Sequence, residues 1–221
     1  MYVENILTAA LESIGPRTFD LPFVDDGELQ IGIWECTPGT LDEPTTDYDE
    51  SMFMVSGRVS VEGPGVAYDI SPGTLWATPR HWAGHWNVHQ TVRKVYVIDN
   101  RSGGPASPGC CANAYTLPLG EAAPRPVVIA GDPRERSLDI WAHNRLNVGV
   151  WECTPGEFPF RRDGYDEVFT VLAGSATLYF DDGRDFHVSA GSVLLTPAGT
   201  TGRWVVHETV RKAYTIINDR D

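Results

Sequence analysis

The sequence predicts an all-β protein made of two tandem copies of one small barrel. Its 221 residues give room for two compact domains of about 100 residues each. Short apolar runs, separated by turn signals rich in Gly, Pro and Asn, are typical of strands in a sandwich or barrel. The decisive observation is an internal repeat, because nearly every segment of the first half has a counterpart in the second.

The repeat consists of four segments in the same order. IGIWECTPG at 31–39 corresponds to VGVWECTPG at 148–156, and DYDESMFMVSG at 47–57 to GYDEVFTVLAG at 164–174. SPGTLWATP at 71–79 corresponds to SAGSVLLTP at 189–197, and WNVHQTVRKVYVI at 86–98 to WVVHETVRKAYTI at 204–216. The single-residue change of offset falls in EGPG and DDGR, which resemble hairpin turns. An insertion at a turn leaves the strand register of both barrels intact.

The domain boundaries follow from composition. Residues 101–113 are rich in Gly, Pro and Ser and read as a linker. We therefore expect an N-terminal barrel over residues 1–100 and a C-terminal barrel over 114–221. The segment ENILTAALESI at 4–14 has helical periodicity and predicts a short N-terminal helix.

Charge and cysteine usage limit the partners and the compartment. The formal net charge of -13 repels phosphate backbones and anionic lipid, so we expect neither a nucleic acid nor a membrane partner. The chain starts without a basic, apolar secretory signal, and no apolar run approaches membrane-spanning length. Cys36 and Cys153 occupy equivalent repeat positions and read as buried apolar residues, while the adjacent Cys110 and Cys111 read as free thiols. A cytoplasmic protein is the expectation.

The specific signal is the spacing within each repeat. Glu50 and Gly57, like Glu167 and Gly174, are separated by six residues. A glycine and a proline separated by five residues follow twice, over 73–79 and 191–197. These spacings match the end of the first cupin motif and the start of the second. With the W-E-C-T-P-G and H-[QE]-T-V-R-K segments, the chain resembles bicupins of the ureidoglycine-aminohydrolase-like and ethanolamine-utilisation-type branch.

The resemblance implies two jelly-roll barrels of the double-stranded β-helix type, in the superfamily of RmlC-like cupins. It covers nearly the whole chain, but cupins support many chemistries, so it leaves the activity open. The family often dimerises through sheet edges, so a homodimer is expected.

Metal-binding cupins use three histidines and the first-motif glutamate, and this sequence departs from that pattern. In the C-terminal repeat the histidine positions hold Arg161, Asp163 and Gly202. In the N-terminal repeat they hold Pro44, Thr46 and Gly84. One carboxylate without imidazoles is a poor transition-metal site, so we expect no metal cofactor.

Two alternatives to a metal-free site stay open. Glu167 and Asp163 could hold a hard divalent ion through oxygen, and His81 and His85 could belong to a shifted ligand set in the N-terminal barrel. In the competing interpretation, Arg161 supplies the positive charge and forms a clamp with Glu167 for a carboxylate or amide ligand.

The alternation of side chains along a strand indicates which residues face inward. With Glu167 inward, the same count turns Arg161, Asp163 and Tyr165 inward, and Trp204 shares the face of the vacant position 202. The C-terminal site is therefore predicted as Glu167 and Tyr165 for catalysis, with Arg161, Asp163, Arg203 and Trp204 for ligand binding. Glu50 and Trp86 are the counterparts in the N-terminal barrel, and both tryptophans could equally be core residues.

The last strand of each repeat carries a basic pair, Arg93–Lys94 and Arg211–Lys212. One residue of each pair should point inward and need a carboxylate partner, which Glu35 and Glu152 or Glu50 and Glu167 could provide.

These residues support three functions. The first is an enzyme that acts on a small polar metabolite by acid–base chemistry in the C-terminal barrel, with Glu167 as base or acid and Tyr165 as donor to an oxyanion. The second is a non-catalytic ligand-binding or scaffold cupin. The third is a metal-dependent cupin enzyme with a rebuilt ligand set. Binding of a small molecule is common to most of these, and the sequence leaves the substrate and reaction undetermined.

Overall fold

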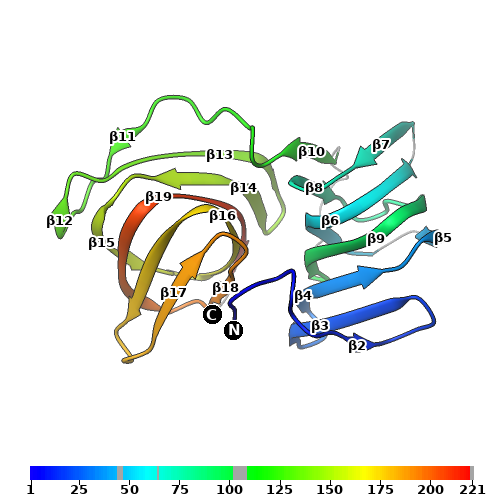
Figure 1. Ribbon diagram of the computed structural model, residues 1–221, viewed down its shortest axis with the longest axis horizontal. Coiled ribbons are helices and arrows are strands. Elements are labelled where there is room, and N and C mark those ends of the chain that lie inside the picture. Colours follow the sequence, from blue (N-terminus) through cyan, green and yellow to red (C-terminus); the bar gives the residue numbers. More distant parts are fainter. Residues whose placement is uncertain (44–46, 64, 102–108, 220–221) are drawn as a thin grey trace. The chain divides into compact units, whose positions relative to one another are not determined.

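The strands of the chain form two separate sheets, each closed into a barrel (Figure 1). The computed structural model describes residues 1–43, 47–63, 65–101 and 109–219. The chain divides into two compact units, Leu7–Asn113 and Ala114–Asp221 together with Met1–Ile6. We call these the N-terminal and the C-terminal barrel.

The N-terminal barrel has nine strands, in the order β10-β8-β6-β9-β4-β3-β2, with β5 paired to β9 and β7 to β6. Its strands are β2 (Glu12–Ser13), β3 (Thr18–Asp25), β4 (Leu29–Cys36), β5 (Gly39–Glu43), β6 (Asp49–Gly63), β7 (Val66–Ile70), β8 (Thr74–Thr78), β9 (Gly84–Asp99) and β10 (Cys110–Asn113).

The C-terminal barrel repeats this order with ten strands, β1-β18-β16-β19-β14-β13-β11, with β12 paired to β15, β15 to β19 and β17 to β16. Its strands are β1 (Tyr2–Val3), β11 (Ala123–Pro124), β12 (Ala130–Gly131), β13 (Arg134–His143), β14 (Leu146–Cys153), β15 (Gly156–Arg161), β16 (Tyr165–Phe180), β17 (Asp185–Ser189), β18 (Val193–Thr196) and β19 (Thr201–Asn218). The predicted all-β fold of two tandem cupin barrels is confirmed.

The edge strands come from unexpected parts of the chain. β1 pairs antiparallel with β18 of the C-terminal barrel, with Tyr2 opposite Leu194. In the N-terminal barrel, β10 takes the equivalent place beside β8, with Cys110 opposite Ala77. The sequence-predicted division left 110–113 in a linker and residues 1–6 with the N-terminal barrel. In the structure each of these segments completes the edge of a sheet.

The predicted helix at residues 4–14 is wrong, since no helix occurs in the described residues. Ile6 is buried, and its backbone N–H donates to the carbonyl of Gly191. Farther along, Glu12–Ser13 forms β2 against β3. Pairing with barrel edges satisfies the backbone of this segment better than one short, isolated helix would. No described helix is therefore available to span a membrane.

The motif glycines are explained by close backbone packing. Gly57 and Gly174 have φ angles of 88° and 76°, a region that favours glycine. A Cβ atom at Gly57 would lie 2.2 Å from the carbonyl oxygen of Thr91, and one at Gly174 would lie 2.1 Å from that of Thr209. These glycines let β6 and β16 bend against β9 and β19 where the strand register shifts.

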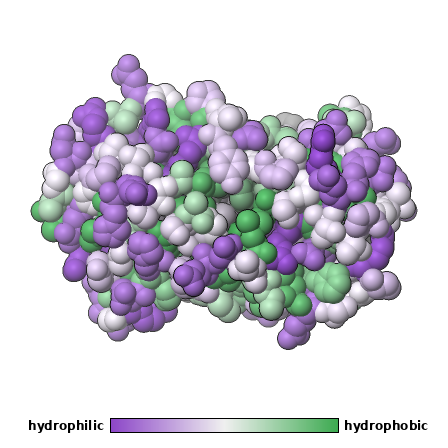
Figure 2. All heavy atoms as spheres, viewed as in Figure 1, coloured by the Kyte–Doolittle hydropathy of each residue, from purple (hydrophilic) through white to green (hydrophobic). Residues whose placement is uncertain are grey.

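Each barrel has its own apolar core, made by the inward faces of its strands. The N-terminal core gathers around Trp76, Trp86 and Met54, and the C-terminal core around Phe158, Phe169 and Trp204. Charged and polar residues cover much of the molecular face in view (Figure 2). In each barrel, charged side chains line a cavity beside this apolar core, which makes the two cavities candidate ligand sites.

Candidate functional site

A cavity of about 270 Å³ opens inside the C-terminal barrel. Two strands and a turn bring charged side chains to it: β16 carries Glu167, β19 carries Lys212, and Arg162 follows directly after β15. The lining residues are Arg125, Ser137, Trp151, Phe158, Phe160, Arg162, Tyr165, Glu167, Trp204, Lys212, Tyr214 and Ile216. The cavity thus combines aromatic walls with a few charged anchors, as small-molecule sites commonly do.

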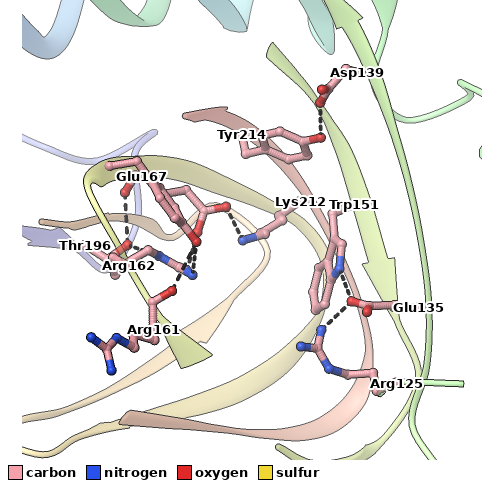
Figure 3. A network of polar contacts seen from close by, with 11 residues as sticks. Arg125, Glu135, Asp139, Trp151, Arg161, Arg162, Glu167, Thr196, Lys212 and Tyr214 are labelled. Atoms are coloured by element: carbon pink, nitrogen blue, oxygen red, sulfur yellow. Dashed lines mark hydrogen bonds and ion pairs between the residues drawn. The ribbon is translucent and has the colours of Figure 1, made fainter. Parts of the chain in front are cut away.

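Glu167 lies at the centre of a buried ion cluster (Figure 3). The ammonium of Lys212 donates to its Oε1 atom at 2.6 Å, and the guanidinium of Arg162 donates to its Oε2 atom. Arg162 also donates from Nε to the hydroxyl of Thr196 at 3.0 Å, and that hydroxyl donates to the backbone carbonyl of Glu167. The side chains of Arg162, Glu167 and Lys212 are all less than a tenth exposed. The cluster is therefore desolvated and held by several hydrogen bonds, most of them to charged groups.

The surroundings of the ion cluster shift the pKa values of Glu167 and Lys212. Burial by itself raises the pKa of Glu167, but Arg162 and Lys212 together hold it below its ordinary value. Burial lowers the pKa of Lys212 to about 8, although Glu167 counteracts part of this effect. Glu167 is therefore a stable anion at neutral pH, whereas Lys212 can gain and lose a proton close to neutral pH.

Aromatic rings surround the ammonium of Lys212. Its Nζ atom lies 4.4 Å from the ring centroid of Phe169, 5.1 Å from that of Trp151 and 5.3 Å from that of Trp204. Such rings stabilise a cation by their quadrupole while keeping water away. Lys212 is thus both desolvated and oriented.

A second polar network supports the wall of the cavity. The indole N–H of Trp151 donates to Glu135 at 2.8 Å, and Arg125 pairs with the same carboxylate oxygen (Figure 3). The Nε atom of Arg125 is buried and has no hydrogen-bond partner within the described residues. Tyr214, on the other side, donates to Asp139. The wall therefore retains one unused buried donor.

The N-terminal barrel has an equivalent cavity of about 260 Å³. Lys94 donates to Oε1 of Glu50 at 2.7 Å, and its ammonium lies 5.1 Å from the ring centroid of Trp34 and 5.2 Å from that of Trp86. The lining residues are Ile14, Asp20, Gln30, Trp34, Leu41, Glu43, Tyr48, Glu50, Trp86, Lys94, Tyr96 and Ile98. The buried lysine–glutamate pair is thus common to both barrels, whereas the other charges differ.

Several sequence-predicted residues line the cavities. Glu167, Tyr165 and Trp204 line the C-terminal one, and Glu50 and Trp86 line the N-terminal one. The hydroxyl of Tyr165 donates to the backbone carbonyl of Arg161 at 3.2 Å. Its hydrogen is therefore already used within the protein. Trp204 and Trp86 are each 2% exposed and also belong to the cores, so the two interpretations of these tryptophans coincide.

Three other predicted residues lie at the surface. Arg161 pairs with Asp163, and the two side chains are 71% and 66% exposed. Figure 3 shows the Arg161 guanidinium directed away from the cluster. Arg203 pairs with Glu157 at 2.8 Å, likewise outside the lining. The inward count fails for Arg161 and Asp163 because strand β15 ends at Arg161 and the turn at Gly164, with φ 73°, restarts the alternation in β16.

Sequence reasoning missed Arg162 and Arg125 and left Lys212 undecided. In both barrels the lysine of the basic pair points inward to the motif glutamate. The arginines pair elsewhere, Arg93 with Glu35 at 2.8 Å and Arg211 with Glu152 at 3.1 Å. The repeated Arg–Lys dipeptide indicated these ion pairs, because both sets of carboxylates predicted as partners are used. The arginines pair with Glu35 and Glu152, and the lysines pair with Glu50 and Glu167. Arg162 carried a weaker signal, as a second arginine beside the chosen one.

The donor set does not fit a metal site of the three-histidine type. Both oxygens of Glu167 are already engaged by cations. His81 and His85 contact Asp47 at 3.5 Å and Asp42 at 2.6 Å, and all four side chains are solvent-exposed. Within the described residues no three His, Cys, Asp or Glu side chains are placed to share an ion.

Two jelly-roll barrels with a charged cavity in each define the chain as a bicupin. It belongs to the family described as EutQ-like cupin domain, which matches residues 24–96 and again residues 142–214. The prediction of a bicupin in the superfamily of RmlC-like cupins is confirmed. No curated protein matches the sequence.

Solved structures share the fold at low sequence identity. A protein of unknown function from Pseudomonas syringae pv. tomato is 20% identical with a TM-score of 0.77, over 97% of this chain and 92% of that one. A putative glyoxylate-induced protein from Pseudomonas aeruginosa is 16% identical with a TM-score of 0.71, over 95% and 84%. A deletion mutant of the oxalate decarboxylase OxdC from Bacillus subtilis is 12% identical with a TM-score of 0.62, over 100% and 77%. At these identities the likeness concerns the fold.

Proposed function

We propose that the C-terminal barrel is the site of an enzyme that binds a small anionic metabolite and exchanges a proton with it through Lys212. The observation that carries this proposal is the buried Lys212 ammonium, held by Glu167 at 2.6 Å inside a cavity of about 270 Å³. No metal is required by this chemistry.

The charge of the cavity favours an anion. Its lining carries three cationic side chains, Arg125, Arg162 and Lys212, against the single carboxylate of Glu167. Glu135 neutralises Arg125 from behind, which leaves one positive charge in excess. Lys212 has three donor hydrogens, of which the described contacts use one, and the Nε donor of Arg125 is unused. A carboxylate would satisfy the remaining donors of Lys212 in a desolvated site, where charge-assisted hydrogen bonds are strong.

The proton-transfer role falls to Lys212 in place of the glutamate. A general base works best when its pKa lies near the working pH, and the pKa of Lys212 is about 8. Glu167 has a lowered pKa and remains an anion, so its proposed role is to hold the ammonium in place. Arg162 lies beside the same carboxylate and is the proposed donor to a developing oxyanion.

Tyr165 takes a positioning role in this proposal. Arg162 donates a hydrogen bond to its hydroxyl at 3.3 Å, and the hydroxyl donates one to the backbone carbonyl of Arg161. Tyr165 would therefore orient the guanidinium, with the substrate contacted by Arg162 itself.

The satisfied ion cluster also favours a second candidate, a binding protein without turnover. Both oxygens of Glu167 and all three nitrogens of the Arg162 guanidinium have partners, as in a purely structural network. Measuring binding and proton exchange separately distinguishes the two candidates.

Binding is tested by tryptophan fluorescence, since Trp151 and Trp204 line the cavity. We expect acetate, malonate and pyruvate to change the emission saturably at constant ionic strength, and neutral acetamide to have no effect. Lys212→Met should weaken binding by at least tenfold. Lys94→Met, the same change in the other barrel, is the matched control and should leave it unaltered. Equal binding of acetamide, or equal loss in the Lys94 variant, would contradict an anion site in the C-terminal barrel.

Turnover is tested by proton NMR in deuterated water. We expect the protein to accelerate exchange of the hydrogens next to the carbonyl of pyruvate, and Lys212→Met to abolish the acceleration. The rate should rise with pH through about 8, because only the neutral amine of Lys212 accepts a proton. Saturable binding without exchange would assign the barrel to the binding candidate.

A further inference from the structure

The two motif glutamates differ in how their second oxygen is used. In the C-terminal barrel, Oε1 of Glu167 binds Lys212 and Oε2 binds Arg162. In the N-terminal barrel, Oε1 of Glu50 binds Lys94, but Oε2 has no partner within the described residues. The Glu50 side chain is 8% exposed. Because Glu50 lines a cavity, this oxygen is available to a donor from a bound ligand.

The C-terminal barrel shows what fits beside such an oxygen. There, the guanidinium of Arg162 occupies the position, between Glu167 and the rings of Phe160 and Tyr165. By the repeat alignment the position of Arg162 corresponds in sequence to Thr45, which lies outside the described residues. Threonine carries no charge, so the N-terminal repeat encodes no cation of its own at this position.

The surrounding side chains have changed in the same direction. Phe160, which packs near Arg162, corresponds to Glu43, and Ser137 corresponds to Asp20. Glu43 accepts a hydrogen bond from Tyr48 at 3.0 Å, and Asp20 accepts one from Tyr96 at 3.2 Å. The other oxygen of Asp20 is buried without a partner in the described residues. These carboxylates line the cavity together with Glu50, against the single cation Lys94.

We propose that the N-terminal barrel is a second ligand site, which binds a small organic cation of the guanidinium or ammonium class where the C-terminal barrel places Arg162. The cation would donate to the free oxygen of Glu50 and to Glu43. Trp34 and Trp86 already stack around the Lys94 ammonium and line the same cavity. The cavity of about 260 Å³ accommodates a small molecule of this kind.

The electrostatics of the site are consistent with this ligand. Burial raises the pKa of Glu50, and the attraction of Lys94 does not cancel the effect. A second cation beside Glu50 would reverse this balance, as it does at Glu167, where two cations share one carboxylate. The proposal concerns a different barrel and the opposite charge from the proposed enzyme site, so the two can fail separately.

The test uses methylguanidinium and methylammonium as probes at millimolar concentrations, measured by isothermal titration calorimetry on the full chain. N-Methylurea, which has nearly the same shape as methylguanidinium but no charge, is the neutral control. We expect saturable binding of at least one cation and none of N-methylurea. Glu50→Gln should weaken binding by at least tenfold, and Glu43→Gln, at a half-buried position, should weaken it severalfold if the Glu50 variant folds poorly.

Glu62→Gln is the matched control variant, because Glu62 is exposed on the same strand, β6, and does not line the cavity. It should bind the cation as the unaltered protein does. In the C-terminal barrel, Arg162→Ala should open a new cation site, so that methylguanidinium raises the melting temperature of this variant more than that of the unaltered protein. Binding of N-methylurea with equal affinity, absence of saturable cation binding, or equal loss in the Glu62 variant would each overturn the proposal.

Discussion

The two barrels have the same framework but cavities of opposite charge. Each contains a buried lysine–glutamate pair between two tryptophans, in cavities of about 260 Å³ and 270 Å³. Around this pair the C-terminal barrel places arginines, whereas the N-terminal barrel places carboxylates. The comparison teaches that the buried lysine–glutamate pair is common to both repeats, while the charged residues around it have diverged.

The difference between the barrels is clearest in the pKa values of the two equivalent glutamates. With two cations on its carboxylate, Glu167 has a lowered pKa despite its burial. With one cation, Glu50 has a raised pKa because burial dominates. The guanidinium of Arg162 therefore accounts for the difference between Glu167, which is stably ionised, and Glu50, whose ionised form is disfavoured by burial.

The largest expected effect comes from neutralising the glutamates. Glu167→Gln leaves Arg162 and Lys212 buried without an anion, and we expect a loss of about 3–5 kcal/mol in the free energy of unfolding. Glu50→Gln leaves only Lys94 unpaired and removes a carboxylate that was itself poorly compensated, so its loss should be clearly smaller. Urea unfolding measures both, and hydrogen-exchange mass spectrometry assigns the loss to a barrel. Equal losses would show that the arginine adds nothing to the C-terminal cluster.

A smaller effect is expected at the edge of the C-terminal barrel. The ring of Tyr2 packs 5.1 Å from that of Phe186, and its hydroxyl donates to the carbonyl of His187. Tyr2→Ala should destabilise the C-terminal barrel by about 2 kcal/mol. Tyr2→Phe keeps the ring and should lose about 1 kcal/mol or less. Hydrogen exchange should quicken in peptides of β17 and β18, and quickening confined to the N-terminal barrel would contradict the assignment of this segment.

The smallest expected effect is a difference in pH dependence. Glu167 has a lowered pKa, so its stabilising contribution is present above the ordinary pKa of 4.5 and is lost as the pH falls. Glu50 has a raised pKa, so its contribution is present below 4.5 and is lost as the pH rises through its folded-state pKa. Between about pH 7 and about pH 4, the cost of Glu167→Gln should shrink and that of Glu50→Gln should grow.

Urea unfolding of the two variants and the unaltered protein at several pH values measures this difference. Parallel pH dependences of the two variants would mean that the environments of the two glutamates are alike.

The fold was predictable from the sequence because its repeat, turn signals and motif spacing are local patterns. Gly57 and Gly174 are readable in this way, since a backbone approach that only glycine permits leaves a fixed spacing from the motif glutamate. The prediction of a helix at residues 4–14 was wrong because this segment makes hydrogen bonds with residues far away in the sequence, such as Gly191. Local propensity contains no information about such an edge.

The candidate site was predictable only in part, for a comparable reason. The glutamates and tryptophans follow from strand alternation within one element, and they line the cavities. Arg162 lies beyond the end of β15, where a turn resets the alternation, so counting from Glu167 selected its neighbour Arg161. Which residue of the Arg211–Lys212 pair faces inward depends on how β19 registers with β16, a tertiary property that the sequence pattern does not specify.

The pairing of β1 with β18 has a consequence for biosynthesis. Residues at the start of this sequence find their partners only when Val193 and Leu194 have left the ribosome, which at ordinary elongation rates is roughly 10–40 seconds later. Until then the first strand waits in solution while the N-terminal barrel can already fold. The order of synthesis and the order of docking are thus reversed for this segment, which is made before Val193 and Leu194 but can join the sheet only after them.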